Sequence, residues 1–470
     1  MSTGSTPYAI WAARPVLPAG TRGKRAQRLL LAFFLGTLLA SGCATEVVHR
    51  GIPDLNQTPY ETYRASLHAS GLNETAIGKS WIDAGESALQ TPIPVHPPFR
   101  EVGYMNPADV SARSYEVQVR QGQRLSVHVA LQSADTFQVF VDLFEASRDT
   151  SNATRHVAIA DSMLVLEVEA KDDLTYLVRL QPELLRGGRY TVDIALDATL
   201  GFPVAGKSAS AIHSPFGVPR DGGRRSHKGV DIFARKGTPV VAISDGYIVR
   251  SQTTPIGGKV VWVRDAKRNQ TYYYAHLDEN YAIANTRVQA GDTLGTVGTT
   301  GNARNTPPHL HFGIYTSYEA VDPEPFIRAA REIGQYAAID ESREDRLGQW
   351  VRVNAEIARL RTAPYRRANL EETLPRYTAL RVMAVTGDWY HVALPDGDSG
   401  FILATLTEDT RNPVRNIQLA ASMPVHYQPN RNAVAIDSIM VGSEVPVFGE
   451  FGNFVGITAP SGQTGWVAMD

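Results

Sequence analysis

The sequence is poor in cysteine and has no excess of either charge. Cys43 is the only cysteine among 470 residues, so the chain can close no internal disulfide. Its 46 lysines and arginines nearly balance 48 aspartates and glutamates, which leaves a formal net charge of −2. Because there is also no basic stripe, the charge pattern gives no reason to expect a nucleic-acid partner. The apolar fraction of 43% and the charged fraction of 20% are ordinary for a globular protein.

One apolar run near the start is too short to cross a bilayer comfortably. This run, LLLAFFLGTLL at 29–39, follows a basic segment at 22–28 and precedes three small residues at 40–42. A basic segment, an apolar run and small residues in this order are typical of a secretory signal. We therefore predict a signal peptide over residues 1–42; the alternative is a short membrane anchor.

The segment LASGC, which ends at Cys43, resembles the lipobox of bacterial lipoproteins. The resemblance implies that Cys43 is lipidated and becomes the first residue of the mature chain. Several acyl chains on one residue would hold the protein firmly to a membrane. Ala44, rather than an aspartate, follows the cysteine, and by the same resemblance this implies the outer membrane. The expected location is the cell envelope, at the periplasmic face of the outer membrane.

Residues 43–98 contain two helical patterns and then a proline-rich stretch. The first pattern places its apolar residues on one helical face between 60 and 67 and stops at Gly71. A second apolar face follows at 77–88. Four prolines at 92–98 are typical of a stiff, extended linker. We predict a lipidated anchor, a small helical hairpin that lies on the next domain, and a linker.

Residues 99–200 change to short alternating strands. Apolar and polar residues alternate in SYEVQVRQGQRLSVHVAL, FQVFVDLF and GGRYTVDIAL, with turn signals between them. Short strands at regular spacing favour a β-sandwich. These segments loosely resemble the jelly-roll domains that are appended to secreted bacterial peptidases, and this resemblance supplies no catalytic residues.

The C-terminal part contains an internal repeat with an offset of 65 residues. Each copy ends in the pattern P-x-G-x-x-G, followed by Phe401 in the first copy and Trp466 in the second. The copies, at 348–410 and 413–470, resemble bacterial SH3-like β-barrels, which often bind cell-wall peptide. The first copy carries LRTAP, close to that family's early signature, whereas the second has VHYQP. For Trp389 and Trp466, a place in the barrel core is favoured over a place in a binding groove.

The stretch PPHLHFGIY sets two histidines one residue apart in a β-prone segment. Successive side chains of a strand alternate faces, so His309 and His311 point to one side while Leu310 and Phe312 point to the other. One face is therefore apolar, and the other carries chemistry or water. Alone this motif is weak, because two histidines on a solvated strand face are common.

Two further motifs contribute polar side chains that could act together with this face. His227 and Asp231 form H-x-x-x-D at the entry to a strand, which brings an imidazole and a carboxylate toward one point. A catalytic zinc site usually takes three protein ligands and leaves the fourth position to water. His227, Asp231 and one of His309 or His311 would complete such a set. His276, in YYYAHLD, is the third element, again at the edge of an alternating strand.

Together the motifs resemble the lysostaphin-type zinc metallopeptidases, which cleave peptide cross-links in peptidoglycan. The resemblance covers residues 212–326 and includes SPFG, KGTPVVA and GNARNTPPHLHF. It implies an antiparallel β peptidase domain, which we place at 205–330, and one Zn²⁺ ion. The roles that it implies are zinc ligation by His227, Asp231 and His311, and catalysis without ligation by His276 and His309.

The sequence thus predicts a zinc metalloendopeptidase whose substrate is peptidoglycan. Some relatives have lost their ligands and only activate amidases, but this chain keeps all five positions. Zinc would make hydroxide available near neutral pH, and a neutral histidine could accept the proton of the water. A cupin is disfavoured, because Glu319 lies eight residues beyond His311 and no second histidine motif follows. The alternative function is a non-catalytic wall-binding lipoprotein that activates an amidase.

Three arginines surround the first predicted ligand, at positions 220, 224 and 225. Arg220, Arg224 and Arg225 would either bind carboxylates of the peptide stem or belong to a solvated loop. His213 is expected to be structural. The predicted fold class is mainly β and multidomain: a helical hairpin, a jelly-roll-like sandwich, an antiparallel β peptidase domain and two small SH3-like barrels.

Overall fold

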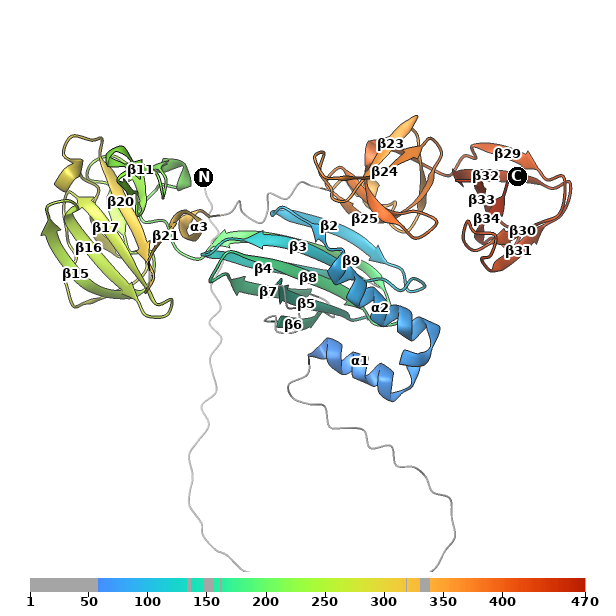
Figure 1. Cartoon of the computed structure of the whole chain (residues 1–470), viewed down its shortest axis with the longest axis horizontal. Coiled ribbons are helices and arrows are strands. Elements are labelled where there is room, and N and C mark those ends of the chain that lie inside the picture. The colour runs from blue at the N-terminus through green and yellow to red at the C-terminus, as the bar shows by residue number, and fades with distance from the viewer. Residues whose placement is uncertain are drawn as a thin grey trace, which may run out of the picture. The chain divides into compact units, whose positions relative to one another are not determined.

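The computed structural model is mainly β, as predicted, and describes residues 58–132, 137–146, 155–160, 163–317, 319–329 and 339–469 (Figure 1). The predicted signal peptide and Cys43 lie outside the described residues, so the lipid anchor stays a prediction. Among the described residues, no helix is both long enough and apolar enough to cross a bilayer.

Two helices lie near the start of the described chain: α1 (Pro59–Ala69) and α2 (Ala76–Gln90). Tyr60 and Trp81 stack with ring centroids 5.1 Å apart, and Phe140 of the sandwich lies 5.9 Å from Tyr60. The indole Nε1 of Trp81 also donates a hydrogen bond to the carbonyl of Pro182 at 2.8 Å. These contacts attach the helices to the sheet that follows.

Residues 93–198 form two sheets over one hydrophobic core, which includes fully buried Val117, Val127 and Val178. The strands of the first sheet, in spatial order, are β1 (Ile93–Pro94), β3 (Arg113–Val119), β8 (Leu174–Pro182), β5 (Val139–Glu145) and β6 (Arg155–Ala160). Those of the second within this segment are β2 (Phe99–Met105), β9 (Gly188–Ala198), β4 (Gln123–Gln132) and β7 (Met163–Glu169), and β2 also pairs with the strand at 379–386. The two-sheet arrangement fits a sandwich, and the jelly-roll likeness stays a prediction.

The proline-rich stretch at 92–98 is extended, but it is not the spacer that its composition suggested. β1 pairs in parallel with β3, with Ile93 opposite Tyr115, and Val95 is buried in the core. Proline tolerates the edge of a sheet because its missing N–H removes only an outward hydrogen bond. The stretch therefore forms an edge of the sandwich.

The third sheet carries the motif residues (Figure 1). Its apolar face builds a separate core that includes Leu310 and Phe312, both fully buried. In spatial order its strands are β10 (Ile212–Ser214), β13 (Val230–Phe233), β20 (His309–Tyr315), β17 (Gln270–Leu277), β16 (Gly258–Asp265), β15 (Gly246–Thr254) and β18 (Arg287–Val288), with β21 (Ala320–Val321) beside β20. Two further two-stranded sheets accompany it: β11 (Pro219–Arg220) with β12 (Arg225–Ser226), and β14 (Pro239–Val241) with β19 (Thr293–Thr296).

The C-terminal repeat is visible in the strand bounds, which recur at the predicted offset. Strands 379–386 and 389–393 of the first copy correspond to 444–451 and 454–458 of the second, each displaced by 65 residues. The first copy contains β22 (Trp350–Val353), β23 (Ile357–Arg361), β24 (Leu370–Pro375), β25 (Ala379–Thr386), β26 (Trp389–Ala393), β27 (Ser399–Leu403) and β28 (Thr407–Asp409). The second contains β29 (Arg415–Gln418), β30 (Met423–His426), β31 (Ala435–Ile439), β32 (Glu444–Phe451), β33 (Phe454–Thr458) and β34 (Thr464–Ala468).

Two short helices, α3 (Glu324–Ile327) and α4 (Glu341–Glu344), precede the first copy. Trp389 and Trp466 are 8% and 2% exposed, so both pack mainly in the interior, as was favoured. The SH3-like likeness of the two copies and the domain bounds drawn from the sequence stay predictions.

Candidate active site

The register between β13 and β20 decides which side chains meet on the polar face of the sheet. Asp231 lies opposite His311, and Phe233 lies opposite His309. Residues directly opposite one another in an antiparallel pair project to the same face. The alternation expected from the sequence therefore holds: the two histidines share one face, and Leu310 lies in the core behind them.

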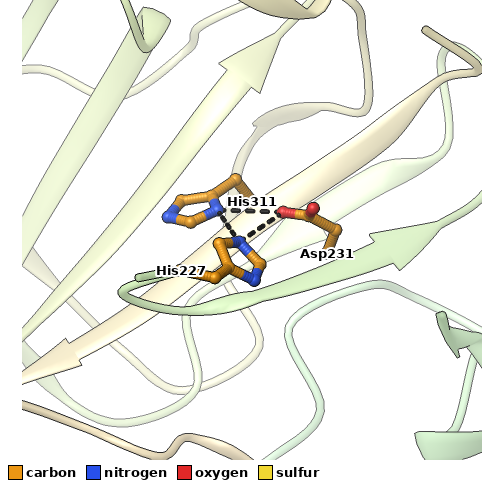
Figure 2. Close-up of side chains that lie close together, drawn as sticks. All are labelled: His227, Asp231 and His311. Atoms are coloured by element: carbon orange, nitrogen blue, oxygen red, sulfur yellow. Dashed lines mark hydrogen bonds and ion pairs between the residues drawn. The ribbon is translucent and has the colours of Figure 1, made fainter. Parts of the chain in front are cut away.

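Three donor atoms converge at this face (Figure 2). His227 Nε2 lies 3.0 Å from Asp231 Oδ1 and 2.9 Å from His311 Nδ1, and the last two atoms are 2.9 Å apart. The other nitrogen of His227, Nδ1, lies 2.9 Å from the carbonyl oxygen of Pro215. We infer from this contact that Nδ1 carries the proton, so that Nε2 presents a lone pair.

The three converging atoms can accept more hydrogen bonds than their protons can supply. This imbalance is a reason to expect a cation between them. With neutral His227 and ionised Asp231, only His311 Nδ1 has a proton to place among the three atoms. A metal ion would satisfy all three lone pairs at once. Two imidazole nitrogens and one carboxylate oxygen are a ligand set that zinc accepts. The side chains therefore fit a zinc ion.

The charges of the cluster are set by burial and by mutual hydrogen bonds. Burial alone would raise the pKa of the Asp231 carboxyl, but its close contacts with the His227 and His311 rings hold it far below its ordinary value. Burial lowers the pKa of His311, against the opposing effect of the Asp231 charge. An ionised carboxylate and a neutral imidazole are the forms that bind a metal.

Arg220 holds the outer oxygen of the same carboxylate. Its guanidinium Nη2 donates to Asp231 Oδ2 at 2.8 Å and to Ser214 Oγ at 2.6 Å. Oδ1 is thereby left to face the histidines. This contact with Asp231 fits a positioning role. Arg220 also lines the cavity described below, and the substrate-binding role considered from the sequence stays a prediction.

His276 reaches the site through an irregularity in its strand. Between β16 and β17 the register shifts so that Ala275 and His276 together oppose one residue, Val260. His276 has φ of +64°, in the left-handed region that only a few residue types adopt readily. A bulge of this kind re-aims a side chain. Backbone irregularity of this sort often marks a functional position.

His276 and His309 form a pair beside the donor cluster. Their rings lie 5.1 Å apart at 64°, and both line a cavity of ≈ 590 Å³ that also holds the three donor residues. Each ring turns Nδ1 to a backbone carbonyl at 2.9 Å, His276 to Thr300 and His309 to Pro307. Nε2 is then the free acceptor of each neutral ring.

Burial, together with the nearby His309, lowers the pKa of His276 to about 4. The His276 ring is therefore neutral at physiological pH. A neutral imidazole with one free nitrogen can accept a proton from water. His276 thus has the form that a general base requires.

An aromatic stack packs against His309. The sequence did not predict this stack. Phe233 stacks on His309 with centroids 5.1 Å apart at 25°, and His213 stacks on Phe233 at 5.1 Å and 18°. The three residues come from the adjacent strands β20, β13 and β10. The alternation of side chains along the strand could have revealed Phe233. It lies two residues beyond Asp231, so the two side chains project to the same face.

The remaining walls of the cavity combine aromatic rings and cations. Tyr273 and Tyr315 line it, and the Tyr273 ring lies 5.9 Å from that of His311. Burial, with a contribution from Tyr315, raises the pKa of Tyr273 to about 12, so its hydroxyl stays protonated. Of the other predicted arginines, Arg225 lines the cavity and Arg224 does not. The structure therefore brings together all five motif residues and two of the three arginines.

Comparison with known proteins bears on this same region. Residues 225–323 match peptidase family M23. The L-Ala--D-Glu endopeptidase of Bacillus subtilis (strain 168) is 36% identical over 141 residues, which cover 27% of this chain and 43% of the relative. The peptidoglycan DD-endopeptidase ShyC of Vibrio cholerae is 37% identical over 94 residues, 20% of this chain and 21% of the relative.

Among solved structures, the catalytic domain of lysostaphin from Staphylococcus simulans is 31% identical, with 27% of this chain and 91% of that chain covered and a TM-score of 0.22. The chain spans less than half the length of the curated relatives it matches. The resemblance expected from the motifs is confirmed to this extent: the chain has homologues among the M23 peptidoglycan endopeptidases.

Proposed function

We propose that this chain is a zinc-dependent endopeptidase that hydrolyses peptide cross-links of peptidoglycan. The observation that carries the proposal is the cavity in which a His-Asp-His donor cluster stands beside His276 and His309. The M23 homologues support a peptidase, and those named as peptidoglycan endopeptidases support the wall as its substrate.

In this proposal His227, Asp231 and His311 hold one zinc ion. When bound, zinc polarises the scissile carbonyl and makes hydroxide available near neutral pH. Asp231 contributes Oδ1 to the ion, while Arg220 fixes Oδ2 and so prevents the carboxylate from rotating. His227 and Asp231 are buried, and His311 is partly exposed to the cavity.

His276 and His309 handle the proton. One of them takes the proton of the attacking water at its free Nε2 and delivers it to the leaving amine, while the other would steady the oxyanion when its own Nε2 is protonated. Their anchored Nδ1 atoms keep both rings turned toward the cavity. The Tyr273 hydroxyl, which stays protonated, is a further donor on the wall of the cavity.

The test is a digest of purified sacculi with the chain from Ala44 onward, followed by analysis of the released muropeptides. We expect cross-linked dimers to disappear, and we expect a chelator to stop their loss and added zinc to restore it. Unchanged muropeptides in the presence of zinc would sink the endopeptidase. Enhanced cleavage by an added amidase, without any cleavage by the chain itself, would instead favour the activator.

We also propose that Cys43 carries the lipid anchor of an outer-membrane lipoprotein. The LASGC segment and the lack of any other cysteine support this assignment. Cys43→Ala should accumulate as an unprocessed precursor that is longer than the mature form. Normal maturation and release from the membrane fraction would refute it.

A further inference from the structure

A second cavity, of ≈ 600 Å³, lies on the first C-terminal copy, and we call it the arginine groove. Alternation along β23 creates it, because Ala358 and Leu360 point into the core and are nearly inaccessible. The residues that alternate with them, Ile357, Arg359 and Arg361, lie on the outer face. The groove is lined by Ile357, Arg359, Arg361, Arg366, Trp389, Leu403 and Leu406.

The arginine groove is strongly cationic and carries no acidic residue in its lining. Arg361 is held in place by a hydrogen bond from Nη1 to the carbonyl of Ala368 at 2.7 Å. Within the described part of the chain, the guanidinium groups of Arg359 and Arg366 have neither an ion pair nor a hydrogen bond. Ile357, beside them, is 65% exposed. Two unpaired guanidinium groups thus flank an exposed apolar surface.

The second copy lacks two of these arginines. At the offset of 65 residues, Arg359 corresponds to Pro424 and Arg361 to His426, whereas Arg366 corresponds to Arg431. His426 Nδ1 lies 2.9 Å from the carbonyl of Ala433, the counterpart of the carbonyl that Arg361 contacts. The second copy therefore forms the same local contact without Arg359 or Arg361, so neither of these two cations is a requirement of the fold.

We propose that the arginine groove binds a short peptide that carries two free carboxylates on either side of an apolar side chain. Guanidinium groups match carboxylates in geometry and charge, and the pairing is strongest where each group forms two hydrogen bonds. Ile357 and the exposed part of Trp389 would receive the apolar side chain. This binding site is separate from the cavity at 590 Å³ and does not rest on its chemistry.

The test is calorimetric titration of the chain from Ala44 onward with N-acetyl-Glu-Leu-Glu, alongside the Gln-Leu-Gln amide as the uncharged analogue. We expect binding of the first peptide that is at least tenfold tighter than that of the second and that weakens with salt. Arg359→Gln combined with Arg366→Gln should lower the affinity about a hundredfold, since each lost charge-assisted hydrogen bond costs on the order of 1.4 kcal/mol.

Arg431→Gln, at the position that corresponds to Arg366 in the second copy, is the matched control and should leave the affinity unchanged. Equal affinity for the two peptides would overturn the proposal. This comparison of two ligands uses the unsubstituted chain, so it does not depend on how any variant folds. Displacement of the peptide by inorganic phosphate at equal concentration would overturn it too, since it would indicate a general anion site. Failure here would leave the digestion of sacculi unaffected, so the two proposals fail separately.

Discussion

Two halves of one cavity use the same residue type in different ways. In the first half His227 and His311 converge on the carboxylate of Asp231, with all contacts within 3.0 Å. In the second half His276 and His309 turn one nitrogen to a backbone carbonyl and face each other. We call these the metal half and the proton half.

The difference between the halves arises from one neighbouring strand. His309 and His311 lie two residues apart on β20, yet they belong to different halves, because His311 lies opposite Asp231 and His309 lies opposite Phe233. In the proposed function, the carboxylate opposite His311 places that imidazole among the metal ligands, whereas the aromatic ring opposite His309 leaves its second nitrogen available for a proton. We propose that the partner across the strand pair separates the two roles.

The largest effect is expected from breaking the metal half. Asp231→Ala removes one donor and the carboxylate that both histidines contact, so we expect the zinc content to fall well below one ion per chain. Activity on cross-linked muropeptides should fall by roughly 10³-fold or more, because the hydroxide source is lost. Metal analysis and dimer hydrolysis check the two effects. Asp398→Ala, at an exposed aspartate, is the control and should change neither.

The proton half should separate catalysis from metal binding. His309→Ala leaves the three donors in place, so we expect the full zinc content and a kcat lowered by about 10²- to 10⁴-fold. His311→Ala, two residues along the same strand, should lose zinc as well as activity. If His309→Ala loses its zinc, then the assignment of the two halves is reversed.

The buried neutral state of His276 predicts a pH-dependent stability of the metal-free chain. Its folded pKa is about 4, below the ordinary 6.5, so the unfolded chain binds more protons between these values. Stability is therefore complete above pH 6.5 and is lost as the pH falls toward 4, by on the order of 3 kcal/mol from this group.

Chemical unfolding of metal-free protein at several pH values checks this dependence. His276→Asn keeps a residue that tolerates the left-handed backbone, and it should flatten the slope between pH 6.5 and 4. An unchanged slope in His276→Asn would assign the proton uptake to another group.

The sequence predicted those parts of the site that follow from local periodicity. The alternation in PPHLHFGIY was enough to put the two histidines on one face and Leu310 in the core. The offset of 65 residues likewise anticipated the strand bounds of both C-terminal copies. The grouping of the five motif residues came from resemblance, since no local pattern relates His227 to His311.

What the sequence did not reveal depends on pairing between distant strands. The bulge at His276 exists because β16 is one residue short against β17, and neither strand shows this alone. The contact of Arg220 with Asp231 depends on where the β11–β12 hairpin folds back. The proline-rich stretch looked like a linker because composition reports backbone stiffness and not the sheet edge that β1 occupies.

The smallest effect is expected from the aromatic neighbour that separates the halves. Phe233→Ala removes the ring that stacks on His309 and leaves every zinc donor untouched, so we expect full zinc content and KM near that of the parent. With His309 held only by its Nδ1 contact, kcat should fall about tenfold, the cost of misplacing a base by a fraction of an ångström. Phe233→Tyr keeps the ring and should restore kcat. Imidazole ¹⁵N spectra offer a readout apart from activity, because the Nδ1–H tautomer of His309 should become mixed in Phe233→Ala only. Loss of zinc in Phe233→Ala would mean instead that the stack supports the metal half, and the boundary between the halves would lie elsewhere.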